Sequence, residues 1–125
     1  MWVVEVLPLA AQVVVLAEGT SDLPEWDTEG VQTVVANRHA ILIATQDDRL
    51  GDVMIGVTVD RAEITLAKPV YVGELAVPTG RVEVGSILSG ELSVASVGPG
   101  GTFQVEVFAS PAGAASHVEI LVSQA

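Results

Sequence analysis

The chain has 125 residues, of which 50% are hydrophobic and only 4% aromatic, and this predicts one domain over residues 1–125 with an aliphatic core. Lys and Arg number 5 against 16 Asp and Glu, a formal net charge of −11. Nucleic acids and anionic membranes attract clustered cations, so we expect this chain to bind neither directly and to suit a basic protein partner. The absence of cysteine excludes disulfides and thiolate metal sites and favours the cytoplasm.

The first segment of the chain, Met1–Ala11, is apolar but carries no Lys or Arg, and Glu5 interrupts it. We therefore expect no signal peptide here. Apolar runs elsewhere are far shorter than the roughly 20 residues that cross a bilayer. Two of them, Gln12–Ala17 and Ala40–Ala44, are apolar at successive positions, which predicts central strands covered on both faces.

Alternation of apolar and polar residues dominates the rest of the chain and predicts strands with one buried face. It extends over residues 53–59, 62–66, 103–109 and 118–122. Residues 70–77 change phase at Gly73-Glu74, which indicates a bulge, and Gly85 allows either a bulge or a close backbone approach. With turn signals between these runs, the pattern predicts an all-β fold, an antiparallel β-sandwich of about eight or nine strands.

One acidic segment interrupts this pattern. Residues 23–31 place a proline and acidic side chains before a run of valines, which indicates one short helical insertion. We predict a partner-binding surface here, with Trp26 as the anchor and nearby carboxylates as electrostatic contacts: Asp22, Glu25, Asp27 and Glu29. The alternative is a solvated acidic loop whose Trp26 folds back over the sheet.

Other candidate sites are weaker. Three carboxylates in residues 47–52 surround a glycine turn, but their spacing differs from an EF-hand, so we expect an acidic turn and no metal site. The two histidines, His39 and His117, lie in no nucleophile motif, and His117 shares the outward face of its strand with Glu119. We therefore predict no catalytic residue, no cofactor and a protein that is not an enzyme.

Three short motifs in chain order resemble the competence protein J family, whose members inhibit a DNA-entry nuclease. They are Glu25–Val31, with its tryptophan and acids, Ala40–Gln46, and Val77–Ile87, which ends in Gly-Ser-Ile. The resemblance implies a small all-β protein that binds a nuclease, or a related immunity-type partner, and blocks it. The late hairpin departs from the family pattern, and Gly100–Phe103 would have to serve there.

We therefore predict a non-enzymatic, acidic protein-binding module. Two alternatives remain open at this stage. One is a structural β-domain that forms homo-oligomers through its sheet edges, since few lysines protect them. The other is a sandwich that binds a small ligand, which a concave pocket with a histidine and converging carboxylates would favour.

Overall fold

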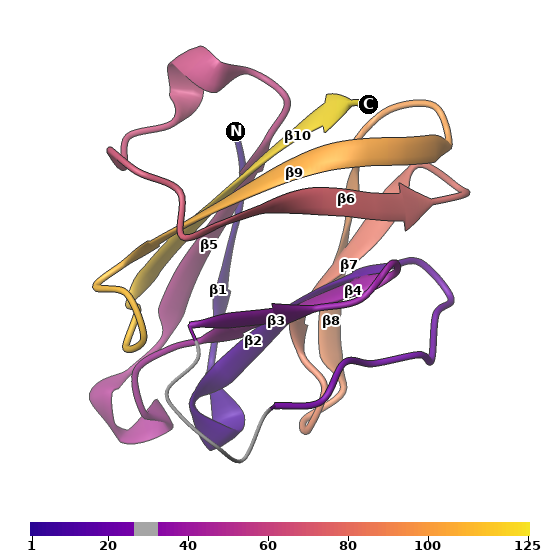
Figure 1. Cartoon of the computed structure of the whole chain (residues 1–125). Coiled ribbons are helices and arrows are strands. Elements are labelled where there is room, and N and C mark those ends of the chain that lie inside the picture. Colours follow the sequence, from indigo (N-terminus) through magenta and orange to yellow (C-terminus); the bar gives the residue numbers. More distant parts are fainter. Residues whose placement is uncertain (27–32) are drawn as a thin grey trace.

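The computed structural model describes residues 1–26 and 33–125, which form two five-stranded sheets packed face to face (Figure 1). The strand order in the first sheet is β1 (Trp2–Val6), β5 (Val53–Thr58), β10 (His117–Gln124), β9 (Gly101–Ser110) and β6 (Tyr71–Val77). The order in the second sheet is β3 (Val34–Ala36), β4 (Ala40–Ala44), β2 (Gln12–Ala17), β7 (Arg81–Ser86) and β8 (Glu91–Ser96). The predicted all-β sandwich is confirmed, with ten strands in the described residues.

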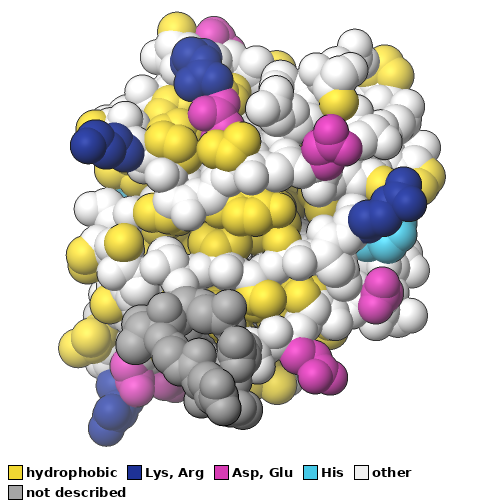
Figure 2. Space-filling view, viewed as in Figure 1, with side chains coloured by type: hydrophobic (Ala, Val, Ile, Leu, Met, Phe, Trp, Pro, Cys, Tyr) yellow, Lys and Arg dark blue, Asp and Glu magenta, His cyan; other side chains and the backbone are white. Residues whose placement is uncertain are grey.

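Strand pairing is antiparallel in both sheets except between β5 and β10, which are parallel. Edge strands β1 and β8 contact each other on one side of the sandwich. Edge strands β3 and β6 border the other side, where Figure 2 shows hydrophobic side chains in a band between the two sheets. There the turn after β3 bridges the sheets, because the Ala76 N–H donates to the Arg38 carbonyl at 2.7 Å.

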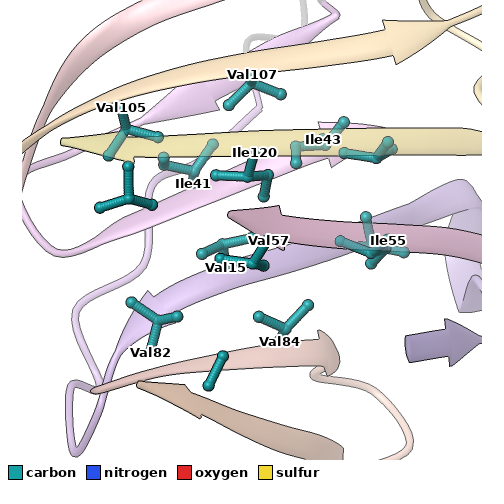
Figure 3. Packing of buried hydrophobic residues seen from close by; sticks show 14 of the residues in the cluster. Val15, Ile41, Ile43, Ile55, Val57, Val82, Val84, Val105, Val107 and Ile120 are labelled. Carbon is teal, nitrogen blue, oxygen red and sulfur yellow. The ribbon is translucent and has the colours of Figure 1, made fainter. Parts of the chain in front are cut away.

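The space between the sheets is filled by aliphatic side chains (Figure 3). Val15, Ile41 and Ile43 from the second sheet face Ile55 and Ile120 from the first, and each is at most 1% exposed. Alternation along each strand sends these residues inward. A filled interior weakens the hypothesis of a ligand bound between the sheets.

Strands β2 and β4 are buried on both faces, as their sequences predict. On the face away from the core, Val14, Leu16, Ala40 and Leu42 form a second buried cluster. Partly buried apolar side chains pack against this cluster: Trp26, Val35, Ile87 and Leu92.

The strand predicted for residues 62–66 is wrong. Arg61–Glu63 form a 3-10 turn, and the residues after it are irregular. The reason is that side chains take the backbone donors that a strand would use. Asp60 accepts the Ala62 N–H, and Glu119 accepts the N–H groups of Thr65 and Leu66, each at 2.9 Å.

Of the two glycine predictions, the one at Gly73 is wrong and the one at Gly85 is confirmed. No bulge occurs at Gly73-Glu74, because β6 pairs with β9 in unbroken register. Gly73 instead makes room for Tyr71, whose hydroxyl would lie 2.1 Å from a Cβ added there. The close approach at Gly85 is confirmed, since an added Cβ would lie 2.0 Å from the Glu91 carbonyl oxygen.

The predicted helical insertion is not seen where the segment is described. Residues 23–26 have no regular secondary structure, and the rest of the prediction, residues 27–31, lies outside the described residues. The helical elements in the described part of the chain are 3-10 turns at Leu9–Ala11, Asp48–Leu50 and Arg61–Glu63. None of the described helices is long and apolar enough to cross a membrane.

Candidate partner-binding surfaces

The described part of the acidic segment leads onto the outer face of the second sheet. Asp22 and Glu25 are exposed. The backbone at Asp22 is held from both sides, since its N–H donates to the Thr20 hydroxyl and its carbonyl accepts the Asn37 side-chain amide at 3.1 Å. Asp27 and Glu29, the other predicted carboxylates, lie outside the described residues.

Trp26 lies against the sheet and is half-buried. Its indole Nε1 donates to Gln12 Oε1 at 2.6 Å, and its ring packs on the second apolar cluster. A tryptophan with a satisfied N–H and one covered face is a fixed point in this segment. The indole therefore positions Glu25 beside it and still presents part of its ring to solvent.

The other sequence candidates serve local structure. The Asp47 carboxylate caps the turn at residues 48–50, accepting the Arg49 N–H and the Arg49 guanidinium, and these bonds lower the pKa of Asp47 to about 2. His39 lies in the turn after β3, with Nδ1 3.5 Å from the Ala76 carbonyl oxygen. Within the described ranges, no group of three or more His, Cys, Asp or Glu is arranged to hold a metal ion.

A concave site lies on the outer face of the first sheet, and we call it the β1–β5 groove. Its volume is about 360 Å³. Its apolar lining comes from strand β5 and the start of the chain: Met1, Val3, Met54 and Gly56. Val3 is 51% exposed and Met54 39%, so much of this lining faces solvent. Gly56 has no side chain, and the Met1 thioether lies over it.

The polar end of the β1–β5 groove is built around a buried carboxylate. Glu119, on β10, is 1% exposed. Its Oε1 accepts the N–H groups of Thr65 and Leu66, and its Oε2 accepts the Thr65 hydroxyl at 2.8 Å. These bonds fasten residues 59–70, which cross over this face between β5 and β6 (Figure 1).

Glu119 stays ionised because its hydrogen bonds outweigh its burial. Burial raises the pKa of Glu119, but the Leu66 N–H, the Thr65 hydroxyl and N–H, and the nearby His117 lower the pKa by more, so that it lies below its ordinary value. Glu63, at the rim, also has a lowered pKa, since it binds the Met1 ammonium and the Thr58 hydroxyl, each at 2.5 Å.

The groups in the β1–β5 groove do not form a relay for nucleophilic catalysis. Such a relay needs a hydroxyl that donates to an imidazole, which a carboxylate then orients. Here the Thr65 hydroxyl donates to Glu119 itself, and His117 Nε2 lies 3.6 Å from Glu119 Oε2, beyond hydrogen-bond distance. The groove does combine a histidine with two carboxylates, which is the feature that the small-ligand alternative required, but these groups assign no proton transfer.

Glu119 is the residue that sequence analysis missed. Alternation along residues 118–122 correctly placed it on the outward face, together with His117. That pattern carries no information on whether a distant segment crosses over the face. The available signal was a lone carboxylate in the middle of an apolar strand sequence, Val-Glu-Ile-Leu-Val.

These features define an acidic, all-β protein of two packed sheets with a concave site on the outer face of the first sheet. A scan against protein-family models finds no match, and a search of curated proteins finds none. Among solved structures, the chain is similar to ComJ from Bacillus subtilis, described as an inhibitor of the DNA-degrading activity of NucA. The TM-score is 0.73 at 18% sequence identity, over 100% of this chain and 96% of that one. The chain thus has a ComJ-like fold, which agrees with the resemblance found in the sequence.

Proposed function

We propose that this protein is a non-enzymatic inhibitor that binds a basic protein partner, a DNA-degrading nuclease. The observation that carries the proposal is the likeness to ComJ, which extends over the whole chain and agrees with three sequence motifs. A shared fold alone does not define function. The charge distribution supplies the second argument.

The negative charge of the chain is largely unopposed. Three of its five Lys and Arg side chains form ion pairs with carboxylates of the same chain, in the pairs Arg49–Asp47, Arg61–Glu106 and Arg81–Glu18. A nuclease cleft that binds DNA carries positive charge, and this charge attracts the phosphates. Carboxylates can occupy such a cleft without offering a bond that the enzyme can cut.

We place the inhibitory contact on the acidic segment, with Asp22, Glu25, Trp26, Asp27 and Glu29 as the binding residues. Support comes from the described part, where Asp22 and Glu25 are exposed and Trp26 is fixed by Gln12. Exposed carboxylates steer a basic partner and raise its association rate. The solvent-facing part of the Trp26 ring would supply apolar contact area.

The test uses NucA, the nuclease that ComJ inhibits, with plasmid DNA as its substrate. We expect the chain to suppress DNA degradation. The triple variant Glu25→Lys, Asp27→Lys and Glu29→Lys should associate at least about tenfold more slowly at low salt and lose most of its salt dependence. Degradation that continues unchanged at saturating protein would contradict the inhibitor function.

A matched control separates the segment from net charge. Asp52, Glu74 and Glu91 are exposed carboxylates elsewhere on the chain. Their combined reversal to lysine changes the net charge by the same amount and should slow association less than the triple variant in the acidic segment. Equal slowing would remove this segment as the contact surface.

We further propose that the protein acts in the cytoplasm, as one domain over residues 1–125 and without a cofactor. The chain has no cysteine, so its fold depends on no disulfide and tolerates a reducing compartment. Its core is filled by aliphatic side chains that need no metal or prosthetic group for their packing.

Self-association is a second candidate function, and strand β6 favours it. Among the described strands, β6 pairs with β9 alone, contains neither lysine nor proline, and presents Val72 at 52% exposure. Its end at Ala76 is closed by the bond to the Arg38 carbonyl, so the free part of the edge lies before Ala76. Light scattering at two concentrations would show a mass that rises with concentration, and Val72→Lys should abolish the rise. Val94→Lys on β8 is the control, and a monomer mass at both concentrations would exclude this function.

A further inference from the structure

We propose that the β1–β5 groove binds the side chain of an arginine presented by a protein partner. The groove lies on the first sheet, whereas the described part of the acidic segment lies on the second. That the arginine belongs to a protein rests on the proposed function. The affinity of the groove for the side chain itself does not.

The shape and polarity of the groove fit a long cationic side chain. Met54 and Val3 provide apolar contact area for the methylene stem of an arginine. Two carboxylates lie at the polar end, where the guanidinium would lie. Glu63 is at the rim with its side chain 40% exposed, and Glu119 lines the groove but is 1% exposed. The Met1 thioether lies over Gly56, where there is no side chain, and forms the floor of the groove.

Acceptor capacity remains at Glu119. Each carboxylate oxygen accepts two hydrogen bonds, and Glu119 Oε1 has both from the Thr65 and Leu66 N–H groups. Oε2 has one, from the Thr65 hydroxyl, and lies beside His117 in the groove lining. A guanidinium N–H can take the remaining position, and its planar donors suit two carboxylates at once.

The charges around the groove favour a cation. Glu119 and Glu63 carry two negative charges, and the Met1 ammonium opposes one of them through its contact with Glu63. Glu5 adds a further carboxylate at the side, since it lies opposite Met54 in the β1–β5 register and is exposed. Together these groups leave an excess of negative charge at this end.

The test is a titration of the intact protein with Nα-acetyl-arginine methylamide, followed through the backbone amide signals of Gly56, Thr65 and Glu119 by NMR at mildly alkaline pH. We expect saturable shifts at these three amides, with a Kd in the range of about 1–10 mM. The citrulline analogue has the same shape without the charge and should bind at least about tenfold more weakly. Shifts that fail to saturate, or equal binding of the two probes, would overturn the proposal.

Two variants and one control locate the site. Gly56→Val displaces the Met1 side chain from its place over Gly56 into the groove. Glu63→Gln removes a charge at the rim. Each variant should weaken binding by about fivefold or more. Glu83→Gln removes a carboxylate from the second sheet and should leave binding within about twofold, whereas an equal loss there would show only general charge attraction. No nuclease enters this experiment, so its failure is distinct from failure of the inhibition assay.

Discussion

Segments outside the strands lie on the outer faces of both sheets, on the second sheet mainly through apolar contact and on the first mainly through hydrogen bonds to a buried carboxylate. On the second sheet, Trp26 and its apolar neighbours lie on a cluster of aliphatic side chains. On the first sheet, the segment over residues 59–70 is fastened by hydrogen bonds to the carboxylate of Glu119. On the same face as Glu119, Phe108 and Leu121 are only 2% and 3% exposed.

We call Trp26 with its apolar neighbours, and residues 59–70, the two covers. The difference between them determines which substitutions and which pH changes should destabilise each one. Apolar contact is not directional and is indifferent to pH, so the Trp26 side should tolerate changes that keep the buried area. A buried carboxylate is directional and depends on its charge, so the Glu119 side should fail when one acceptor is lost. The two covers also carry the two proposed contact surfaces, so their stability bears directly on binding.

The largest effect is expected from Glu119→Ala. This change leaves the Thr65 and Leu66 N–H groups without their acceptor and should lower the free energy of unfolding by about 3 kcal/mol. Urea unfolding measures the loss, and hydrogen exchange should show faster exchange at these two amides before global unfolding.

The matched control for this change is Thr65→Val. It keeps the Thr65 N–H and removes only the hydroxyl bond to Oε2, so it should cost about 1 kcal/mol. If Glu119→Ala were no more destabilising than Thr65→Val, the carboxylate would not be what holds the segment in place.

A smaller effect is expected from Trp26→Ala on the other sheet. Loss of a half-buried indole and of its bond to Gln12 should cost about 2 kcal/mol, below the 3–5 kcal/mol typical of fully buried aromatic residues. Trp26→Phe keeps most of the apolar contact and should cost roughly half as much. Urea unfolding of both variants measures the two losses in the free energy of unfolding.

The double variant Glu119→Ala with Trp26→Ala tests whether the covers are independent. They lie on different sheets and share no hydrogen-bond partner among the described residues. Their costs should therefore add to within about 0.5 kcal/mol. A larger departure would mean that the two faces are coupled through the core.

Much of the fold was predictable because it depends on local patterns. Alternation at residues 118–122 and the double-sided apolar run at Ala40–Ala44 each depend on which way side chains point from a strand. The Glu119 contact depends instead on a residue more than fifty positions away, at Thr65. The same contact explains the wrong strand at residues 62–66, where alternation is real but the backbone donors bind carboxylates. The sequence therefore predicted a contact surface on the acidic segment, which stays a prediction, and gave no indication of the groove.

The smallest effect is expected in how the free energy of unfolding changes at acidic pH. A carboxyl whose pKa is lower in the folded state than in the unfolded state contributes stability that is complete above its unfolded pKa and is lost as the pH falls through its folded pKa. The pKa of Glu119 is lowered, so its contribution should fade below about pH 4.3. Glu119→Gln keeps an oxygen acceptor and cannot ionise, so its stability should fall less steeply in that range. Urea midpoints measured across the acid range give the two slopes.

Trp26→Phe serves as the comparison in this measurement, because it changes the apolar cover and no titrating group. Glu18, Asp47 and Glu63 also have lowered pKa values through their own ionic partners, and they contribute equally to all three proteins. The urea midpoint of Trp26→Phe should therefore fall with pH in parallel with that of the unmodified chain. The midpoint of Glu119→Gln should instead approach that of the unmodified chain as the pH falls. Parallel curves for all three would show that the charge of Glu119 contributes nothing to holding residues 59–70, and the contrast between the two faces would then lie in hydrogen-bond geometry alone.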